Sequence, residues 1–245
     1  MAPGPPKSPE AATGCCGASA VALPVAAVVA ALLEAGEDCV DAEELARRLF
    51  LRPGLVRAAL ERLVEAKGLE LNGGRACIAD RVELALAAVR LGVPETAVAR
   101  GLDWRMFEEY AARALREAGF EARRGLRLYG RGGLELDVLG LDPAGGLVVA
   151  IDCKHWNPRV STPSRLRAAA AQHRARVGRL AASWRQLGLP QGRWRIVPAL
   201  LVLRESVPRL AEGVAVVPAS RLRGFIEELP VLAEEPAIHV VRLEA

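Results

Sequence analysis

Two apolar segments joined by a tight turn constrain the fold of this chain more than any other feature. Residues 134–141 and 147–153 are mostly apolar on both faces, and the sequence Asp-Pro-Ala-Gly-Gly at 142–146 between them is typical of a turn. Strands that are apolar on both faces usually lie in a sheet covered on each side. Segments with helical periodicity alternate with strand-like segments along residues 103–245, so we expect an α/β domain with its sheet flanked by helices.

The turn also predicts how the two strands pair. If residues 143–146 form the loop, Asp137 lies opposite Asp152 and Glu135 lies opposite Lys154, all on one face at the open end of the hairpin. Directly opposite Cβ atoms are roughly 4.5–5.5 Å apart. Two carboxylates at that distance repel each other unless they share a proton or a cation. The sequence therefore predicts a site for a hard divalent ion, with Mg²⁺ as the first choice, although a bulge would shift this register.

The remaining elements of residues 103–245 follow from capping residues and periodicity. An amphipathic helix is expected from Asp103 to Glu117, with Gly119 ending it, and a last helix is expected to be capped by Ser220. Other expected elements are strands near 120–129, 195–203, 214–217 and 238–242 and a long helix over 164–187. Residues 81–102 are expected to form a helical linker to the preceding domain.

The N-terminal region has a different pattern. Residues 1–19 are rich in Pro, Gly, Ala and Ser and are expected to be a disordered tail. Residues 20–80 predict three helices, the first opening at Pro24 and the second capped by Asp41, followed by a hairpin at Asn72-Gly73. This order resembles the winged helix-turn-helix domain. Arg57, with Arg52 and Arg62, favours DNA binding by the third helix, whereas docking of a protein remains the alternative.

Cys39 and Cys77 belong to the same N-terminal region. In a winged helix, a short strand before the second helix pairs with the last strand of the wing, and this would make the two thiols neighbours. A disulfide and two buried free thiols are both compatible with that position, and we favour the free thiols. The five Cys form no Cys-x-x-Cys pair, which argues against a structural zinc site and favours a cytoplasmic protein.

The charged residues of the second domain resemble those of the PD-(D/E)xK nuclease superfamily, in particular Mrr-like restriction endonucleases and archaeal Holliday-junction resolvases. The resemblance rests on Phe107-Glu108 early in a helix, Asp137 in the second strand and Asp152-Cys153-Lys154 in the third. Gln172 on the long helix occupies a position where Mrr-like members often carry Gln. The resemblance covers residues 103–230. The sequence departs from the family pattern in having no Pro before Asp137.

The resemblance implies a restriction-endonuclease-like fold and metal-assisted hydrolysis of a phosphodiester. Asp137, Asp152 and Glu108, with the carbonyl of Cys153, would hold Mg²⁺ or Mn²⁺. Lys154 would orient the attacking water and stabilise charge on the phosphate. Glu135 is either an outer ligand or a simple ion-pair partner of Lys154. A non-catalytic DNA-binding or regulatory protein on a decayed nuclease fold is the alternative function.

A long stretch without acidic residues indicates the substrate. From Cys153 to Arg204 the chain has eleven Lys and Arg residues and no Asp or Glu, although its net charge is only +4. Apolar spacing buries one side of the long helix, with His173 expected to be packed there, and leaves its arginines on the surface. Arg165, Arg167, Arg176 and Arg179 are the expected nucleic-acid contacts on this helix.

The composition excludes some classes of protein and leaves others open. No apolar run reaches the roughly 18–20 residues that a membrane span needs, so no membrane partner is expected. DNA is the expected partner, and the sequence is also compatible with a homodimer. Only 3 of the 33 basic residues are Lys, and one of them is Lys154. An amine whose pKa can shift suits water activation, which Arg cannot supply.

Overall fold

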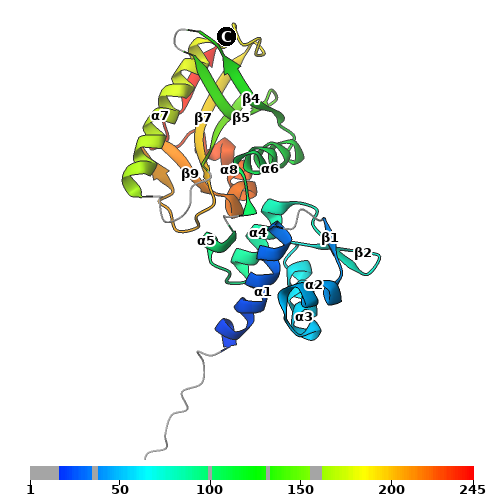
Figure 1. Ribbon diagram of the computed structural model, residues 1–245. Coiled ribbons are helices and arrows are strands. Elements are labelled where there is room, and N and C mark those ends of the chain that lie inside the picture. Colours follow the sequence, from blue (N-terminus) through cyan, green and yellow to red (C-terminus); the bar gives the residue numbers. More distant parts are fainter. Residues whose placement is uncertain (1–16, 35–37, 99–100, 131–132, 155–161) are drawn as a thin grey trace, which may run out of the picture.

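A mixed seven-stranded sheet forms the centre of the larger part of the molecule (Figure 1). The computed structural model describes residues 17–34, 38–98, 101–130, 133–154 and 162–245. The strands are β4 (Glu121–Leu128), β5 (Leu134–Asp142), β6 (Leu147–Lys154), β7 (Arg193–Val202), β8 (Leu210–Ala211), β9 (Val214–Pro218) and β10 (Val241–Glu244). Their order is β4-β5-β6-β7-β9-β8, and β10 pairs with the amino end of β7. Because β6, β7 and β9 are parallel and the other neighbours antiparallel, the expected α/β fold class is confirmed.

Helices cover both faces of this sheet, as the apolar strands predicted (Figure 1). Helix α7 (Pro163–Ala182) lies on one face, and α6 (Trp104–Glu117) and α8 (Leu222–Leu232) lie on the other. Successive residues of β6 point to opposite faces. Accordingly, Val148 and Ala150 pack with Val177 of α7, whereas Val149 and Ile151 belong to the core on the side of α6.

The smaller part of the molecule contains the N-terminal elements. These are α1 (Gly17–Glu34), β1 (Cys39–Val40), α2 (Ala42–Leu49), α3 (Pro53–Glu65), β2 (Glu70–Asn72), β3 (Arg75–Cys77), α4 (Arg81–Arg90) and α5 (Glu95–Val98). The short strands form a sheet in the order β1-β3-β2. Apolar side chains of α1–α4 form one continuous core with those of α6 and α8, so the two parts are packed together rather than joined only by a linker.

Local signals for helix starts and turns were mostly correct. Asp41 caps α2 through hydrogen bonds from the N–H groups of Glu43 and Glu44, at 2.9 and 3.1 Å. The hairpin forms where it was predicted, but its turn is shifted by one residue, because Asn72 pairs with Arg75. Gly73 and Gly74, with φ of +57° and +81°, are the two central residues. Two glycines satisfy the positive φ that both central positions of a type I′ turn require.

Four boundaries differ from the expectation. Residues 1–16 of the expected disordered tail lie outside the described residues, while α1 begins at Gly17 and contains Pro24 in its interior. The alanine-rich segment before Pro24 has high helix propensity, which explains the longer helix. Helix α7 ends at Ala182 instead of 187, and β10 begins at Val241 instead of 238. Ser220 is not a cap, because it lies in a 3₁₀ turn (Ala219–Arg221) that precedes α8.

None of the described helices is suited by length and apolar character to cross a membrane.

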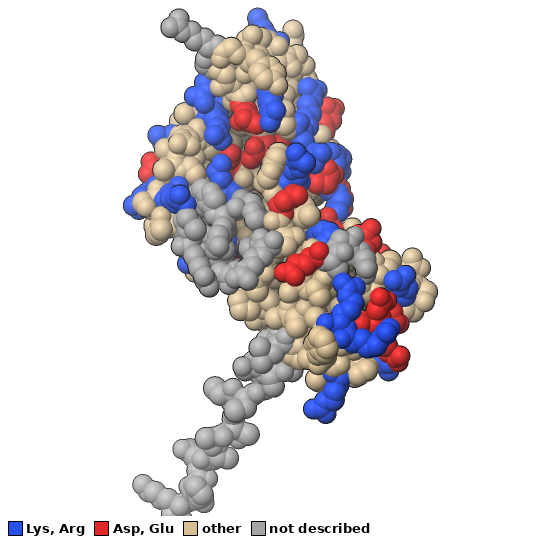
Figure 2. Space-filling view, in the orientation of Figure 1, with Lys and Arg blue, Asp and Glu red and all other residues tan. Residues whose placement is uncertain are grey.

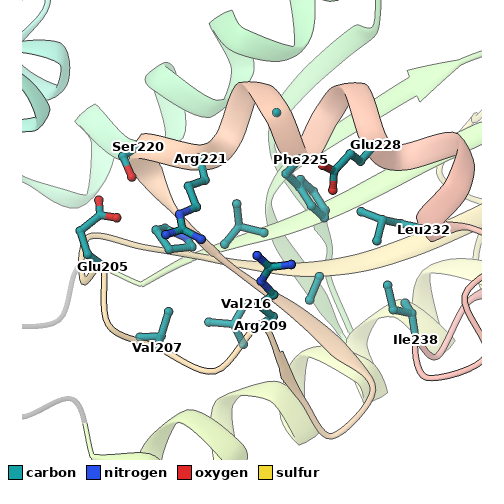
Figure 3. A pocket seen from close by; sticks show the side chains of 14 residues that line it. Glu205, Val207, Arg209, Val216, Ser220, Arg221, Phe225, Glu228, Leu232 and Ile238 are labelled. Atoms are coloured by element: carbon teal, nitrogen blue, oxygen red, sulfur yellow. The ribbon is translucent and has the colours of Figure 1, made fainter.

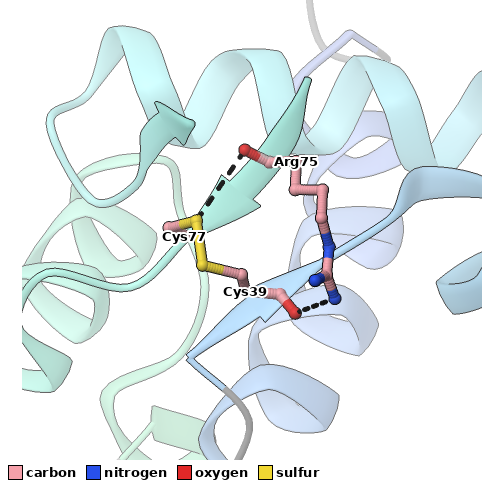
Figure 4. Close-up of a disulfide and its surroundings, with 3 residues drawn as sticks. All are labelled: Cys39, Arg75 and Cys77. Carbon is pink, nitrogen blue, oxygen red and sulfur yellow. Dashed lines mark hydrogen bonds between the residues drawn. A yellow bond between two sulfur atoms is a disulfide. The ribbon is translucent and has the colours of Figure 1, made fainter. Parts of the chain in front are cut away.

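A disulfide joins β1 to β3 in the smaller part (Figure 4). Cys39 and Cys77 are directly paired in the antiparallel register, so the prediction that they are neighbours is confirmed. The favoured interpretation as two free thiols is wrong, because the structure bonds their sulfur atoms. Arg75 supports the same pair of strands, since its Nη2 donates a hydrogen bond of 2.7 Å to the carbonyl of Cys39.

Loss of this disulfide is expected to destabilise the protein. The bond closes a loop with a sequence separation of 38 residues. The loop-entropy relation gives about 3–4 kcal/mol for a loop of that length. The double variant Cys39→Ser, Cys77→Ser should lose this much free energy of unfolding in a denaturant titration. Reductant should destabilise the wild type by a similar amount and leave the double variant unchanged. A wild type insensitive to reductant would contradict this account of the bond.

Candidate active site

The site lies where β5 and β6 leave the regular part of their hairpin. Paired residues run from Asp142 with Leu147 to Val138 with Ile151, which confirms the predicted register over this segment. Asp137 is the next residue of β5 beyond the last pair. The prediction from the turn sequence, that Asp137 and Asp152 lie at the same end of the hairpin, is therefore consistent with this register.

The side chain of Asp137 bridges the two strands beyond that point. Its Oδ2 accepts a hydrogen bond of 2.7 Å from the backbone N–H of Cys153. On the other side of β5, Gly125 of β4 has a φ of +61° and is not among the residues paired with β5. Irregularities of this kind occur next to active sites because they redirect a side chain. Asp137 is thus directed toward β6.

Asp152 is a buried carboxylate between two cations. The residue is 2% exposed, its Oδ1 lies 2.8 Å from Nη1 of Arg176, and its Oδ2 lies 2.6 Å from Nζ of Lys154. The contact with Arg176 has hydrogen-bond geometry, whereas the ion pair with Lys154 does not satisfy Oδ2 with a hydrogen bond. One buried oxygen of Asp152 therefore has capacity for a further ligand.

Glu108 on α6 completes the group of acids at this end of the sheet. Burial raises the pKa of Glu108, and the nearby charge of Asp137 raises that pKa further. Burial also raises the pKa of Asp137, with a second contribution from the charge of Asp152. The three carboxyl groups therefore sense one another in a partly desolvated environment, which is the arrangement that a bound cation would relieve.

The donor chemistry of these residues fits a hard divalent cation. Carboxylate oxygens and a backbone carbonyl are the ligands that Mg²⁺ prefers, and the buried Oδ2 of Asp152 lacks a hydrogen bond. Over the described part of the chain, no group of three or more His, Cys, Asp and Glu residues is already arranged to hold a metal ion. Lys154 and Arg176 neutralise Asp152 in this conformation.

Glu135 does not pair with Lys154. Its Oε1 lies 2.6 Å from Nη2 of Arg127 on β4, and its side chain is 62% exposed. Lys154 instead contacts Asp152 and pairs along the backbone with Val202 of β7. The prediction that Glu135 and Lys154 lie on one face assumed that both strands are regular. The irregularity at Asp137 separates Glu135 from Lys154. The interpretation of Glu135 as an ion-pair partner of Lys154 is therefore wrong.

His173 fixes helix α7 against the sheet beside the site. The residue is fully buried, as its place on the apolar side of the helix predicted, and its Nε2 lies 2.8 Å from the carbonyl oxygen of Ala150. Burial lowers the pKa of His173, which favours the neutral ring with Nε2–H as the donor. Ala150 precedes Asp152 by two residues, and Arg176 follows His173 by three. This contact thereby brings Arg176 to Asp152.

The other predicted residues of α7 lie on its surface. Arg165, Gln172 and Arg179 are exposed and follow the flank that carries Arg176, whereas Arg167 is on the opposite flank. That opposite flank contacts the turn between β8 and β9, because Arg174 donates a hydrogen bond to the carbonyl of Glu212. The side chains of Arg165, Arg167 and Arg179 make no ion pair with any other residue that the structure describes.

Sequence reasoning missed two features of this site. It treated Arg176 only as a phosphate contact, although its guanidinium also holds Asp152. It also overlooked Arg124 and Arg127 on β4, whose charges lower the pKa of Glu108 against the effect of burial. The acid-free stretch identified Arg176 as one of several expected phosphate contacts, and only the packing of α7 shows that it also contacts Asp152.

Comparison with known families agrees with this geometry. Residues 99–184 match the family model Mrr_cat, described as a restriction endonuclease. The match supports the nuclease superfamily. It covers α6, β4, β5, β6 and α7, and hence every residue of the candidate site. The segment that contains the candidate site therefore resembles this restriction endonuclease family, and the match covers about a third of the chain.

Comparisons over the whole chain add less. No curated protein matches it significantly. The crystal structure of protein VC1899 from Vibrio cholerae is similar over 88% of this chain and 52% of that chain, with 13% sequence identity and a TM-score of 0.34. The chain thus spans about half the length of VC1899.

The raised pKa of Asp137 leads to a prediction about stability. A carboxyl group whose pKa is higher in the folded than in the unfolded state binds protons more tightly when folded. Its ionisation therefore destabilises the fold as pH rises through the interval between the two pKa values. Asp137→Asn removes this cost and keeps an oxygen acceptor for the N–H of Cys153. We expect the variant to melt above the wild type at neutral pH in chelator.

The difference should shrink as pH falls through the interval between the two pKa values and vanish below the ordinary pKa of Asp, where the wild-type side chain is protonated in both states. Asp142→Asn, in the turn of the same hairpin, is the matched control and should show no comparable gain. A melting temperature of Asp137→Asn below that of the wild type at neutral pH would contradict the proximity of the acids.

Proposed function

We propose that this chain is a Mg²⁺-dependent endonuclease that hydrolyses phosphodiester bonds of DNA. The observation that carries the proposal is the meeting of Asp137, Asp152 and Lys154 at one end of β5 and β6, inside the segment that matches the restriction endonuclease family. Burying charged groups is costly. The end of a sheet with only a structural role would therefore not need a buried pair of acids in contact with a lysine.

Each residue then has a role that follows from its position. Asp137, Asp152 and Glu108, with the carbonyl of Cys153, would hold Mg²⁺ or Mn²⁺. The ion would supply Lewis-acid stabilisation of the phosphate and lower the pKa of a bound water. Lys154 would orient water toward the phosphate and stabilise developing negative charge. Gln172, one turn before Arg176 on the same flank, would border the substrate.

Arg176 would have two partners in this proposal, Asp152 and a phosphate of the substrate. Without substrate, its guanidinium balances the charge of Asp152. A guanidinium has five N–H donors in a planar fork, so it can contact a phosphate while keeping a hydrogen bond to a carboxylate. This arrangement couples substrate binding to the position of Asp152.

Helix α7 would guide the DNA backbone to the site. Arg165 and Arg179 are exposed, lack ion-pair partners among the described residues, and share a flank with Arg176. Figure 2 shows acidic side chains of the larger part lying between basic ones on the face in view. A cationic border around an acidic centre allows phosphates to bind next to a metal site without neutralising it.

The N-terminal part would be the winged helix, and its charges favour a different use from the one expected. A groove of about 490 Å³ lies between α3 and the β2–β3 hairpin and is bordered by Asp41, Glu43, Glu61 and Glu65. Arg57, the expected DNA contact, has Nη2 3.8 Å from Oε1 of Glu43. Four acids repel phosphate, so this observation favours docking of a basic protein segment over DNA contact by this groove.

The salt dependence of DNA binding tests the path along α7. The double variant Arg165→Ala, Arg179→Ala should reduce the slope of log affinity against log salt by about two units, since each phosphate contact contributes about 0.9. Arg193→Ala, Arg242→Ala is the matched control. It removes the same charge near the amino end of β7, away from the site, and should leave the slope unchanged. Equal slopes for both double variants would show that these α7 arginines contact no phosphate.

A cleavage panel tests the proposed function itself and defines the substrate. Plain duplex, modified duplex, flap, four-way junction and RNA would be incubated with the wild type in Mg²⁺ and in chelator. We expect cleavage of at least one DNA substrate in Mg²⁺ only. Arg57→Ala, measured for binding to the cleaved substrate, should keep wild-type affinity if the groove at α3 serves a protein. Binding of every DNA without cleavage would favour the non-catalytic alternative.

A further inference from the structure

A pocket of about 490 Å³ that does not include Asp137, Asp152 or Glu108 lies between α8 and the end of the sheet formed by β8 and β9 (Figure 3). Its walls combine apolar and charged side chains. Val207 and Val216 lie on one side, and Phe225 and Leu232 of α8 lie on the other, with Ile238 at one end. A cavity of this size that combines apolar walls with polar groups has the dimensions of sites for small organic ligands.

Two arginines point into this pocket from opposite sides. Arg221 extends from the start of α8 and Arg209 from the segment before β8, toward the same space (Figure 3). Neither has an ion-pair partner among the residues that the structure describes. Two unpaired guanidinium groups facing one cavity repel each other, and a phosphate bound between them would remove that repulsion.

The start of helix α8 adds further donors for an anion. Neither the 3₁₀ turn at Ala219–Arg221 nor α8 has a side-chain cap, and the hydroxyl of Ser220 lines the same end of the pocket. Uncapped N–H groups at a helix start attract anions. Three independent features, the arginine pair, the hydroxyl and the helix start, therefore converge on one anion-binding end.

The pocket also contains two carboxylates, Glu205 near Ser220 and Arg221 and Glu228 farther along α8 (Figure 3). Glu205 already has an interaction partner, whereas Glu228 has no ion pair with another described residue. Glu228 lies two turns along α8 from Arg221, beside Phe225 (Figure 3). A carboxylate at that place accepts hydrogen bonds from hydroxyl or amino groups, and the ring of Phe225 offers an apolar surface.

We propose that this pocket binds a nucleoside phosphate. Its phosphate would lie between Arg209 and Arg221, its base against Phe225, and a hydroxyl or amino group of the nucleoside at Glu228. The nucleoside phosphate is either a free nucleotide or a nucleotide within a nucleic-acid strand. This binding does not depend on catalysis by the acids.

The topology favours a connection between this pocket and the candidate active site. β6, β7 and β9 are parallel, and Lys154 pairs with Val202, which pairs with Pro218. The carboxyl ends of the three strands therefore lie along one edge, where ligands of such sheets usually bind. Two strand spacings of about 4.8 Å separate β6 from β9, or roughly 10 Å. Ser220 and Arg221 lie within three residues of the end of β9, so both sites share this edge.

Calorimetric titration of the full chain in chelator tests the proposal without cleavage. The probes are AMP, inorganic phosphate and a single-stranded oligonucleotide with a 5′-phosphate. The variants are Arg209→Ala, Arg221→Ala and, as control for surface charge, Arg193→Ala at the amino end of β7. We expect each pocket variant to weaken nucleotide binding at least tenfold and the control to leave it unchanged. Inorganic phosphate should bind at least tenfold more weakly than AMP.

The outcomes separate the two sources of the ligand. Binding of AMP that the pocket variants abolish supports a free nucleotide, and binding of the oligonucleotide alone, abolished by the same variants, supports a nucleotide of a strand. Affinities of both probes that the pocket variants leave unchanged would overturn the proposal. Equal affinity for inorganic phosphate and AMP would also overturn it, because the nucleoside would then contribute nothing. None of these results depends on whether the acids cleave DNA.

Discussion

Replacing Asp152 with Asn is expected to lower the rate of DNA cleavage by roughly 10²–10³-fold or more, the loss seen when one electrostatic stabiliser of a transition state is removed. Asp152 is buried and contacts both Lys154 and Arg176. Asn keeps the size of the side chain but removes its charge, so it would bind a divalent ion weakly. It would also leave Lys154 without its ion-pair partner. DNA affinity should persist, because the exposed arginines of α7 are unchanged.

The same substitution elsewhere in the hairpin provides the control. Asp142 accepts hydrogen bonds of 3.1 Å from the N–H groups of Ala144 and Gly145 in the turn, and Asn can accept these as well. Asp142→Asn should therefore cleave at the wild-type rate. Single-turnover rates and DNA affinity, measured side by side for the two variants, separate loss of chemistry from loss of binding. Equal cleavage rates of both variants would show that Asp152 is not part of the active site.

Replacing Trp184 with Ala is expected to have the largest effect on stability, a loss of about 3–5 kcal/mol. Trp184 is 1% exposed, and its ring centroid lies 5.6 Å from that of Trp194. Its Nε1 donates a hydrogen bond of 2.7 Å to the carbonyl of Pro190. The substitution would leave a cavity under the end of α7. It would also remove one of the two hydrogen bonds that the carbonyl of Pro190 accepts, the other coming from Nε1 of Trp194.

For a chain of this length each kcal/mol shifts the melting temperature by roughly 2–4 °C, so a decrease of roughly 6–20 °C is expected. Trp104 is the matched control, since it is 50% exposed at the start of α6. Trp104→Ala should change stability by less than about 1 kcal/mol. A loss for Trp184→Ala no greater than that for Trp104→Ala would show that the burial of Trp184 contributes little to folding.

The sequence predicted those parts of the fold that local chemistry determines. The turn at 142–146 set the register of β5 and β6, because its length leaves one way to pair the apolar residues on each side. Periodicity correctly predicted that His173 on α7 and Trp184, just beyond the end of that helix, are buried. The acid at position 41 capped α2 because an Asp before a helix satisfies free N–H groups without help from the rest of the protein.

Contacts between distant elements were beyond such reasoning. The partner of Arg176 depends on how α7 crosses the sheet, which the helix pattern alone does not specify. Glu135 was misplaced because an irregular strand beside Asp137 has no clear signature in sequence, apart from the glycine at 125 on the neighbouring strand. For Cys39 and Cys77, topology predicted proximity, but the bonded state required the close register of β1 and β3.

The most direct test of the central claim is single-turnover cleavage of labelled DNA by the wild type and by Asp137→Asn, each in Mg²⁺ and in chelator. The acids at the end of β5 and β6 are proposed to work only with a divalent ion. We therefore expect product from the wild type in Mg²⁺ alone, and none from Asp137→Asn under either condition, although the variant still binds the DNA. Cleavage by Asp137→Asn at the wild-type rate, or by the wild type in chelator, would contradict the proposed site.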